Sequence, residues 1–252
     1  ALVGVDQGLP TGTVLSLTQD RDGFIWLGTE NGLIRYEGRE YRKWTKQDGL
    51  VSSWIRRVVA DPEGGVWVGT LQGLMRFRNG RFENALFGEE RSDSPVYSMA
   101  FDGRGLIWVS TRQGVFRQEN DLLYRKIPWP GPHIPNGLTY GHKSGQVYLA
   151  GDDGIHALAD DLSLRSWGRE NGLPVSNWSV VVEDGLGRVW IGSGRLLYMK
   201  DPGSDTFLDR SHLLPAAMTP NNLPTADVER SKAEIEAVIG RASCRERVCS
   251  VV

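Results

Sequence analysis

The side chains that could contact a small molecule lie in segments that do not repeat along the chain. Trp54 and Trp178 hold nearly equivalent places, each just before an expected strand, and exposed rings beside polar amides would suit stacking on a sugar ring. Arg112 could hold a carboxylate or a sulfate through two parallel hydrogen bonds. By type and place, the candidate ligand-binding residues are Trp54, Arg112, Gln113, His133, Asp152, Asp153 and Trp178.

Each of these candidates also has a structural interpretation, which the sequence leaves open. The rings of Trp54 and Trp178 could cap the edge of a sheet core. Arg112, like Arg56 and Arg57, could be solvated or could pack its methylene stem against apolar surface. Both interpretations therefore need the fold before they can be weighed.

The residue types that carry catalysis do not have catalytic spacing. Asp152 and Asp153 are adjacent, so on a strand their side chains point to opposite faces and form no carboxylate pair. Asp20–Gly23 begins like a calcium loop but lacks the remaining ligands. No spacing typical of a metal site relates the four histidines, His133, His142, His156 and His212. We expect no catalytic residue, no metal site and no cofactor.

The composition is that of an ordinary folded protein. The chain has 252 residues, of which 40% are hydrophobic and 24% charged, with a formal net charge of −2. No cluster of Lys and Arg suggests nucleic-acid binding, and no apolar run is long enough for a membrane helix. The 31 Gly and 9 Trp indicate many tight turns and a large aromatic side chain in each unit of a repeat.

The repeat has a period of 41 residues. "GFIWLGTENGL" begins at Gly23, "GGVWVGTLQGL" at Gly64 and "GLIWVSTRQGV" at Gly105. Trp190 lies 82 residues beyond Trp108, which is two periods, and the slot between them holds a tyrosine, Tyr148. Five copies can therefore be placed on the chain.

One copy predicts four strands. "VLSLTQD" (14–20) alternates apolar and polar residues, "FIWLGT" (24–29) is an apolar run, and "LIRYEG" (33–38) and "EYRKWT" (40–45) complete the set. Asn31–Gly32 is a strong signal for the hairpin turn between the middle two strands. Four antiparallel strands per 41 residues predict an all-β fold, a β-propeller with five four-stranded blades.

The repeated residues are expected to have structural roles. A tryptophan in each copy would fill the wedge between adjacent blades, and the glycine after it would allow a neighbour to approach closely. These positions are Trp26, Trp67, Trp108, Trp190, Gly28 and Gly69. A binding site is needed only once, so we expect it among the variable residues of the inter-blade links and the turns between second and third strands.

The period also sets the expected boundaries. We expect blades at 14–54, 55–95, 96–136, 137–177 (degenerate) and 178–218, after the end of a preceding blade at 1–13. Residues 219–238 would begin a further blade or form a linker. The tail 239–252 opens with "IGRASCRERV", which resembles a translated sequencing adapter, so we expect it to be non-native.

The pattern "GLP…V…D..G.IW.GT..GL.RY" resembles the two-component regulator propeller repeat, over residues 6 to about 200. That family forms the periplasmic sensor region of hybrid histidine kinases and of some diguanylate cyclases. Its propellers usually have seven blades, so the resemblance implies that five blades are a truncated part of the ring. The fourth copy departs from the pattern, with Tyr148 in place of Trp and "HKSG" at His142 in place of the Asp turn.

The resemblance implies a non-enzymatic sensor, located in the periplasm as part of an inner-membrane protein. It implies a small-molecule or glycan ligand, signalling domains downstream in the same chain and a homodimer in the full-length protein. It implies no nucleic acid partner and no membrane contact by this segment. Two alternatives remain open: a lyase similar to the streptogramin lyases, which use a histidine and a metal, and a structural or adhesive propeller.

Overall fold

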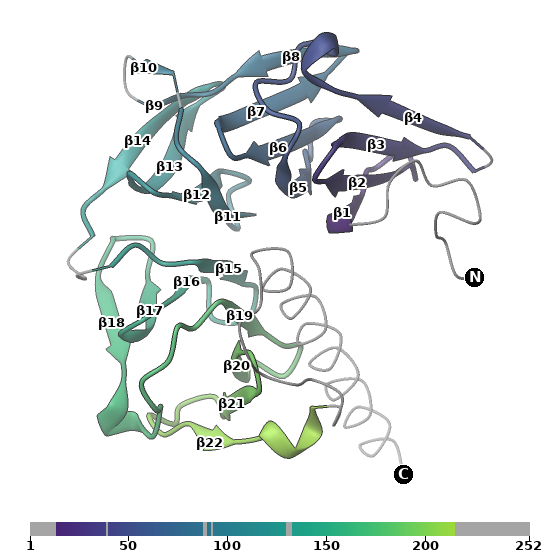
Figure 1. Ribbon diagram of the computed structural model, residues 1–252. Coiled ribbons are helices and arrows are strands. Elements are labelled where there is room, and N and C mark those ends of the chain that lie inside the picture. The colour runs from purple at the N-terminus through teal and green to yellow at the C-terminus, as the bar shows by residue number, and fades with distance from the viewer. Residues whose placement is uncertain (1–13, 39, 88–89, 92, 130–132, 215–252) are drawn as a thin grey trace. The chain divides into compact units, whose positions relative to one another are not determined.

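The computed structural model describes residues 14–38, 40–87, 90–91, 93–129 and 133–214 (Figure 1). The expected preceding blade at 1–13, the region 219–238 and the tail 239–252 lie outside the described residues. The chain divides into two units, Ala1–Met99 with Gly105–Pro128 and Ala100–Arg104 with Trp129–Val252. Each unit is described by itself.

The described residues form five sheets, antiparallel except for one added edge strand, so the all-β propeller architecture that the repeat predicts is confirmed. The first sheet comprises β1 (Val14–Gln19), β2 (Ile25–Thr29), β3 (Gly32–Tyr36) and β4 (Tyr41–Trp44). The second comprises β5 (Ile55–Ala60), β6 (Val66–Thr70), β7 (Gly73–Arg78) and β8 (Arg81–Asn84). The core of the third is β11 (Val96–Phe101), β12 (Ile107–Thr111), β13 (Gly114–Asn120) and β14 (Leu123–Ile127).

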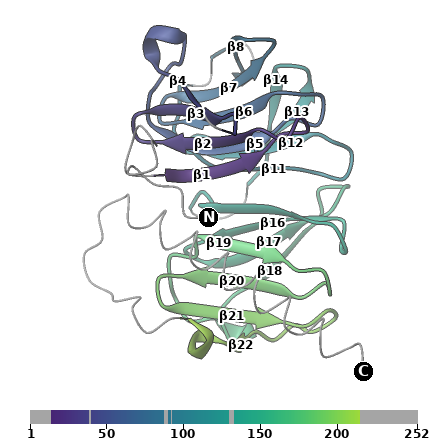
Figure 2. The ribbon, with the colours of Figure 1, turned by 90° about the vertical axis from the view of Figure 1, so that its right-hand side faces the viewer.

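The second unit holds the last two sheets. The fourth sheet comprises β15 (Gly137–Gly141), β16 (Gln146–Gly151), β17 (Gly154–Leu158) and β18 (Leu164–Trp167). The fifth comprises β19 (Val180–Glu183), β20 (Val189–Ser193), β21 (Leu196–Lys200) and β22 (Leu208–Asp209). Figure 2 shows the strands of the fifth sheet one beside the next in chain order, the arrangement of a propeller blade.

The third sheet differs from the expectation because it has six strands. Two short strands from the end of the second repeat, β9 (Leu86–Phe87) and β10 (Glu90–Arg91), extend its outer edge, with β9 parallel to β14. The Phe87 ring stacks on Phe116 at 4.2 Å between centroids. An edge strand has unpaired backbone groups, and here a neighbouring segment of the same chain pairs with them.

An aspartate in the first turn of a sheet fixes both the turn and the repeated tryptophan. Asp20 Oδ1 accepts the backbone N–H groups of Asp22 at 3.0 Å and Phe24 at 2.9 Å. Its other oxygen, Oδ2, accepts the indole N–H of Trp26 at 2.6 Å. Asp184 binds Trp190 in the same way at 2.9 Å. This tether places a ring that is 1% exposed in each of the two sheets.

An arginine covers the face of the repeated tryptophan in the first three sheets. Arg35 is paired across strands with Trp26, and its guanidinium lies 5.4 Å from the ring centroid. Arg76 lies 5.3 Å from Trp67 in the second sheet. The arginine and the repeated tryptophan therefore form a cation–π pair in each of these sheets.

The glycine two residues after the tryptophan lies where the next sheet packs. A Cβ atom at Gly28 would lie 2.9 Å from side-chain atoms of Ile55 and Val58 on β5. A Cβ atom at Gly69 would lie 2.6 Å from Val96 on β11. Real Cβ contacts are longer than this, so these two positions have no room for a larger residue.

Candidate ligand-binding site

The space between the first and second sheets, here called the first wedge, is filled with large side chains. Trp26 stacks on Trp44 with 5.3 Å between ring centroids, and Phe77 of the second sheet lies 5.3 Å from Trp26. Arg35 lies over both tryptophan rings. All three aromatic rings are 5% exposed or less. The first wedge therefore has the dense packing of a protein core.

The space between the fourth and fifth sheets, here called the fourth wedge, has the same framework with smaller or polar side chains. Tyr148 takes the place of the repeated tryptophan. Its cross-strand partner is Ala157, where the first sheet has Arg35 opposite Trp26. The ring and guanidinium of the first wedge are thus replaced by a smaller ring and a methyl group.

The fifth sheet contributes a lysine to the fourth wedge. Lys200 is paired with Val189, the residue before the repeated tryptophan of its sheet. Phe77 is paired with Val66, which holds the same place in the second sheet. Lys200 and Phe77 therefore have equivalent registers, and a cation replaces a buried ring.

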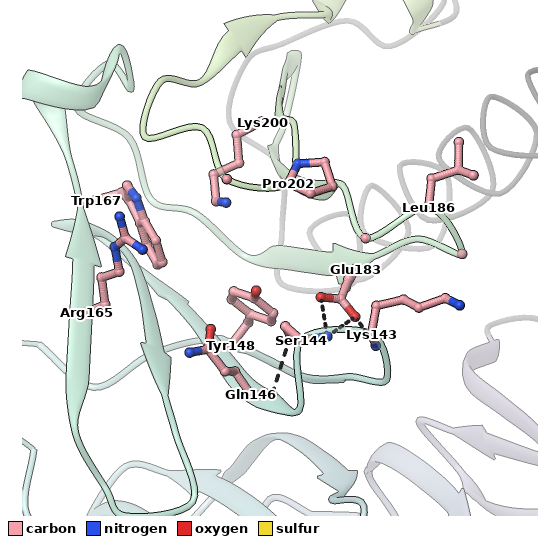
Figure 3. A pocket seen from close by; sticks show the side chains of 13 residues that line it. Lys143, Ser144, Gln146, Tyr148, Arg165, Trp167, Glu183, Leu186, Lys200 and Pro202 are labelled. Atoms are coloured by element: carbon pink, nitrogen blue, oxygen red, sulfur yellow. Dashed lines mark hydrogen bonds between the residues drawn. The ribbon is translucent and has the colours of Figure 1, made fainter.

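These replacements leave a cavity of about 550 Å³ within the second unit, shown in Figure 3. Its volume lies in the range of small-molecule sites. The lining residues are Lys143, Ser144, Gln146, Tyr148, Arg165, Trp167, Glu183, Gly185, Leu186, Gly187, Lys200, Pro202 and Gly203. They come from the first turn of each of the two sheets, from β16, β18 and the end of β19, and from the end of β21 and the turn after it.

The first turn of the fourth sheet takes its cap from the neighbouring sheet. Its sequence has His142 where the other sheets have aspartate, and His142 is exposed. Glu183 at the end of β19 replaces the missing carboxylate, because it accepts the backbone N–H groups of Lys143 at 2.7 Å and Ser144 at 3.2 Å. These bonds, drawn in Figure 3, hold the carboxylate at one side of the cavity.

A second carboxylate beside the cavity, that of Asp205, also has its partners within the protein. Asp205 forms an ion pair with Arg165 on β18. The same Asp205 oxygen accepts the indole N–H of Trp167 at 2.9 Å. The Arg165 guanidinium lies 5.0 Å from the Trp167 ring centroid. Asp205 therefore neutralises the arginine and orients the tryptophan.

Lys200 is the buried cation of the site. The residue is 6% exposed, and its Nζ lies 5.1 Å from the Trp167 ring centroid. Within the part of the chain that the structure describes, Nζ makes no hydrogen bond and no ion pair. Burial lowers the pKa of Lys200, and the positive charge of Arg165 lowers it further. In Figure 3 its amino end points toward Trp167 and Tyr148.

The remaining polar groups suit hydrogen bonds with a neutral ligand group. Burial raises the pKa of Tyr148, so its phenol stays protonated and can donate. Gln146 and Ser144 add an amide and a hydroxyl to the lining. Three cations and one carboxylate line the cavity, which gives it a positive character.

The two tryptophans that the sequence suggests for sugar stacking lie in different environments. Trp178 is 1% exposed and belongs to the core between the last two sheets, with its ring edge-on to Tyr198 at 5.7 Å. It therefore matches the structural interpretation, because a ring so buried has no free face for a sugar. Trp54 is half-buried in the link before β5.

Arg112, Gln113 and His133 are exposed on loops. Gln113 donates a hydrogen bond to Asp93 at 3.2 Å. The His133 carbonyl accepts the indole N–H of Trp129 at 2.8 Å. Arg112 is held at its backbone, where its N–H binds the carbonyl of Pro95 at 3.2 Å.

Asp152 and Asp153 form the exposed turn between β16 and β17. An Asp153 carboxylate oxygen lies 3.1 Å from His156 Nε2, and His156 Nδ1 lies 2.8 Å from Ser166 Oγ. His156 is 6% exposed and packs edge-on against Trp129. Both nitrogens of this histidine therefore have partners in the sheet, which makes it a structural residue.

None of the seven predicted residues lines the fourth-wedge cavity. In an antiparallel sheet the first and third turns share one end, and the second turn and the link to the next sheet share the other. Most of the residues that the sequence suggests lie at the second end of the sheets, whereas the cavity lies among turns at the first end. Sequence signals for it existed in the joint loss of aspartate at His142 and tryptophan at Tyr148.

The residues that the structure describes contain no group of three or more His, Cys, Asp or Glu that could hold a metal ion. None of their helices is long and apolar enough to cross a membrane.

Comparison with solved structures places the fold among β-propellers. An extracellular domain of a hybrid two-component system from B. thetaiotaomicron shares 18% identity at a TM-score of 0.65, over 83% of this chain and 30% of that one. A second such domain from the same organism shares 20% identity at 0.68, over 83% and 32%. A virginiamycin B lyase from Staphylococcus aureus shares 16% at 0.66, over 80% and 71%.

The chain thus spans about a third of the length of those two-component extracellular domains. No curated protein matches it in sequence. Residues 8–31 match the family model described as the two component regulator propeller, and the described part of this match, from Val14, contains β1, the Asp20 turn and β2. The chain is therefore an all-β protein of the β-propeller fold that carries a two-component regulator propeller repeat.

Proposed function

We propose that the chain is a ligand-sensing propeller of an extracytoplasmic bacterial signalling protein, and that it binds its ligand in the fourth wedge. The observation that carries this proposal is the contrast between two equivalent spaces. The first wedge is filled by Trp26, Trp44 and Phe77, whereas the fourth wedge holds a cavity of about 550 Å³. Packing alone favours a filled wedge, so an open one with polar lining fits a binding role.

The comparisons support a sensor more than an enzyme. The repeat is the one named for two-component regulators, and two of the similar folds are extracellular domains of such systems. In this proposal the propeller itself is not catalytic. A histidine kinase or diguanylate cyclase in the same chain, beyond a membrane, reads the bound state, and dimerisation of the full-length protein transmits it.

The ligand class we propose is a small molecule or a glycan. Hydroxyl-rich ligands need donors and acceptors at close spacing, and the cavity offers the Tyr148 phenol and the Gln146 amide. Ligand binding changes signalling only if the ligand has different affinities for two states of the assembly. The boundary between the fourth and fifth sheets is where this difference would arise.

The test is a thermal-shift screen of the 252-residue chain against a panel of mono- and oligosaccharides and small metabolites. Lys200→Phe restores the residue that fills the first wedge and should abolish any shift that arises in the cavity. Lys46→Met is the control, because Lys46 is exposed on a 3-10 helix in the first unit and the charge change is the same. A hit that survives Lys200→Phe would exclude the fourth wedge as the binding site.

The gene on both sides of the segment distinguishes the sensor from the lyase alternative. A membrane span followed by a kinase or cyclase domain is expected for the sensor. A stop codon after the remaining blades, with no such domain, would overturn the signalling role whatever the cavity binds.

A further inference from the structure

The charge of the fourth wedge is not balanced by its own carboxylates. Glu183 is occupied by two backbone N–H groups of the neighbouring turn, and Asp205 is occupied by Arg165 and Trp167. Lys200 is left at the floor of the cavity, 6% exposed, with no hydrogen bond or ion pair to the described residues. A buried charge is costly unless it is paired, and a bound anion would give Lys200 the ion pair that the described residues do not supply.

The position tolerates an apolar residue, so the lysine is not required by the fold. Phe77 holds the equivalent place in the second sheet and packs against Trp26, Trp44 and Phe82. The same register therefore accepts a ring where no ligand space is kept. A lysine in its place removes apolar contacts and adds a charge, whose cost a bound anion would offset.

The rest of the cavity lining restricts the class of anion that could bind. The Trp167 ring centroid lies 5.1 Å from the amino group, and partial burial strengthens the attraction of the charge for a carboxylate. The Gln146 amide and the Tyr148 phenol lie on the same lining, whereas the Ser144 hydroxyl is already bonded to the Gln146 backbone N–H at 3.3 Å. A ligand that pairs with the Lys200 charge and also forms hydrogen bonds with the polar lining has one carboxylate and several hydroxyls.

We infer that the fourth wedge binds a small hydroxylated carboxylate of the sugar-acid class, with its carboxylate on Lys200 Nζ and its hydroxyls on the polar lining. The choice of a sugar as the ligand rests on the proposed function, whereas the choice of an anion rests on Lys200 alone. Hydrogen bonds to charged groups are among the stronger ones in proteins, so the carboxylate contact should dominate selectivity.

The experiment measures binding of four compounds to the 252-residue chain by calorimetry. D-glucuronate and D-galacturonate are the sugar acids, D-glucose is the neutral counterpart, and tartrate is a hydroxy acid that is not a sugar. We expect the sugar acids to bind at least about tenfold more tightly than glucose. We also expect Lys200→Met to abolish this preference, while Lys46→Met retains it.

The outcomes separate this inference from the proposed function. Equal affinity for glucuronate and glucose, or an unchanged preference in Lys200→Met, would overturn the anion contact. A neutral sugar that binds in the cavity would then leave the sensor proposal intact. Tartrate binding as tightly as the sugar acids would keep the role of Lys200 and refute the sugar-acid class. Circular dichroism of Lys200→Met, compared with the parent, shows that the variant is folded.

Discussion

The first and fourth wedges are built on the same strand register and differ at a few side chains. In the first, Trp26 and Phe77 fill the space between the sheets, and in the fourth Tyr148 and Lys200 take their places. The pairing of the second and third strands is equivalent, but the contents change from three aromatic rings and an arginine to a lined cavity. The comparison teaches that a repeat protein can make a binding site by removing packing groups from one repeat.

The largest effect is expected from placing the lysine in the filled wedge. Phe77→Lys removes a ring that is 5% exposed and puts a charge among aromatic side chains. We expect the free energy of unfolding to fall by about 3–5 kcal/mol, the range for losing a large buried ring. Urea unfolding of the variant and the parent measures it. A change below about 1 kcal/mol would mean that the two wedges are not as different as their packing indicates.

The next largest effect concerns Asp184, the first-turn aspartate of the fifth sheet, which has no counterpart in the fourth sheet. Asp184→Ala removes the acceptor of the Trp190 indole and the partner of Arg188, so we expect a loss of about 2–3 kcal/mol. The matched control is His142→Ala, at the equivalent but exposed position, which should change stability by less than about 0.5 kcal/mol. Similar losses in both variants would contradict the special role of the aspartate tether.

The same aspartate makes the free energy of unfolding depend on pH in the acid range. Burial raises the pKa of Asp184, but hydrogen bonds from Trp190 and Arg188 outweigh it and hold the pKa below the usual value. Its stabilising contribution is therefore present above the unfolded-state pKa of about 3.9 and is lost as the pH falls through the folded-state value. Unfolding of the parent and Asp184→Asn at pH 7 and near pH 3 should show a smaller difference in acid.

Lys200→Met should increase stability, by about 1 kcal/mol, because it replaces an unpaired buried charge with an apolar side chain of similar length. A gain in stability with a loss of sugar-acid binding is the pattern of a residue kept for function. A loss of stability would show that Lys200 supports the fold, and thermal unfolding distinguishes the two results.

The smallest effect is in the pH dependence of sugar-acid binding. Burial and then Arg165 lower the pKa of Lys200, while the carboxylates of Asp205, Glu183 and Asp201 act in the opposite direction. Because the charged amine binds the carboxylate, affinity is full below this pKa and falls as the pH rises through it. The fall should therefore begin below the ordinary lysine pKa of about 10.4. Glucuronate binding measured from pH 6 to 10 tests this, and a flat profile would contradict it.

Much of the fold is predictable from the sequence because it repeats. The 41-residue spacing of Trp26, Trp67 and Trp108, continued by Tyr148 and Trp190, gives the number of sheets, and the turn residues give their strands. The added pair β9 and β10 was missed, because Leu86–Phe87 is too short to show a strand pattern and its partner lies in the next repeat.

The candidate site is less predictable, for a physical reason. Tyr148 and His142 were visible as departures from the pattern, but they could equally mark a degenerate repeat. In the sequence Lys200 looks like an ordinary strand residue. Its pairing with Val189 shows that it holds the position in the fifth sheet that Phe77 holds in the second sheet. Burial and the absence of a partner are properties of the packed structure, and no spacing in the sequence carries them.

The Glu183 contact has a consequence for how the blades become ordered. Four of the five first turns carry their own aspartate, but the turn at Lys143 and Ser144 takes its carboxylate from the following repeat. Repeat four is thus completed only when repeat five has docked, which shifts stability from the single repeat to its boundary with the next. A compound bound at that boundary would contact both repeats and would therefore stabilise their docked state.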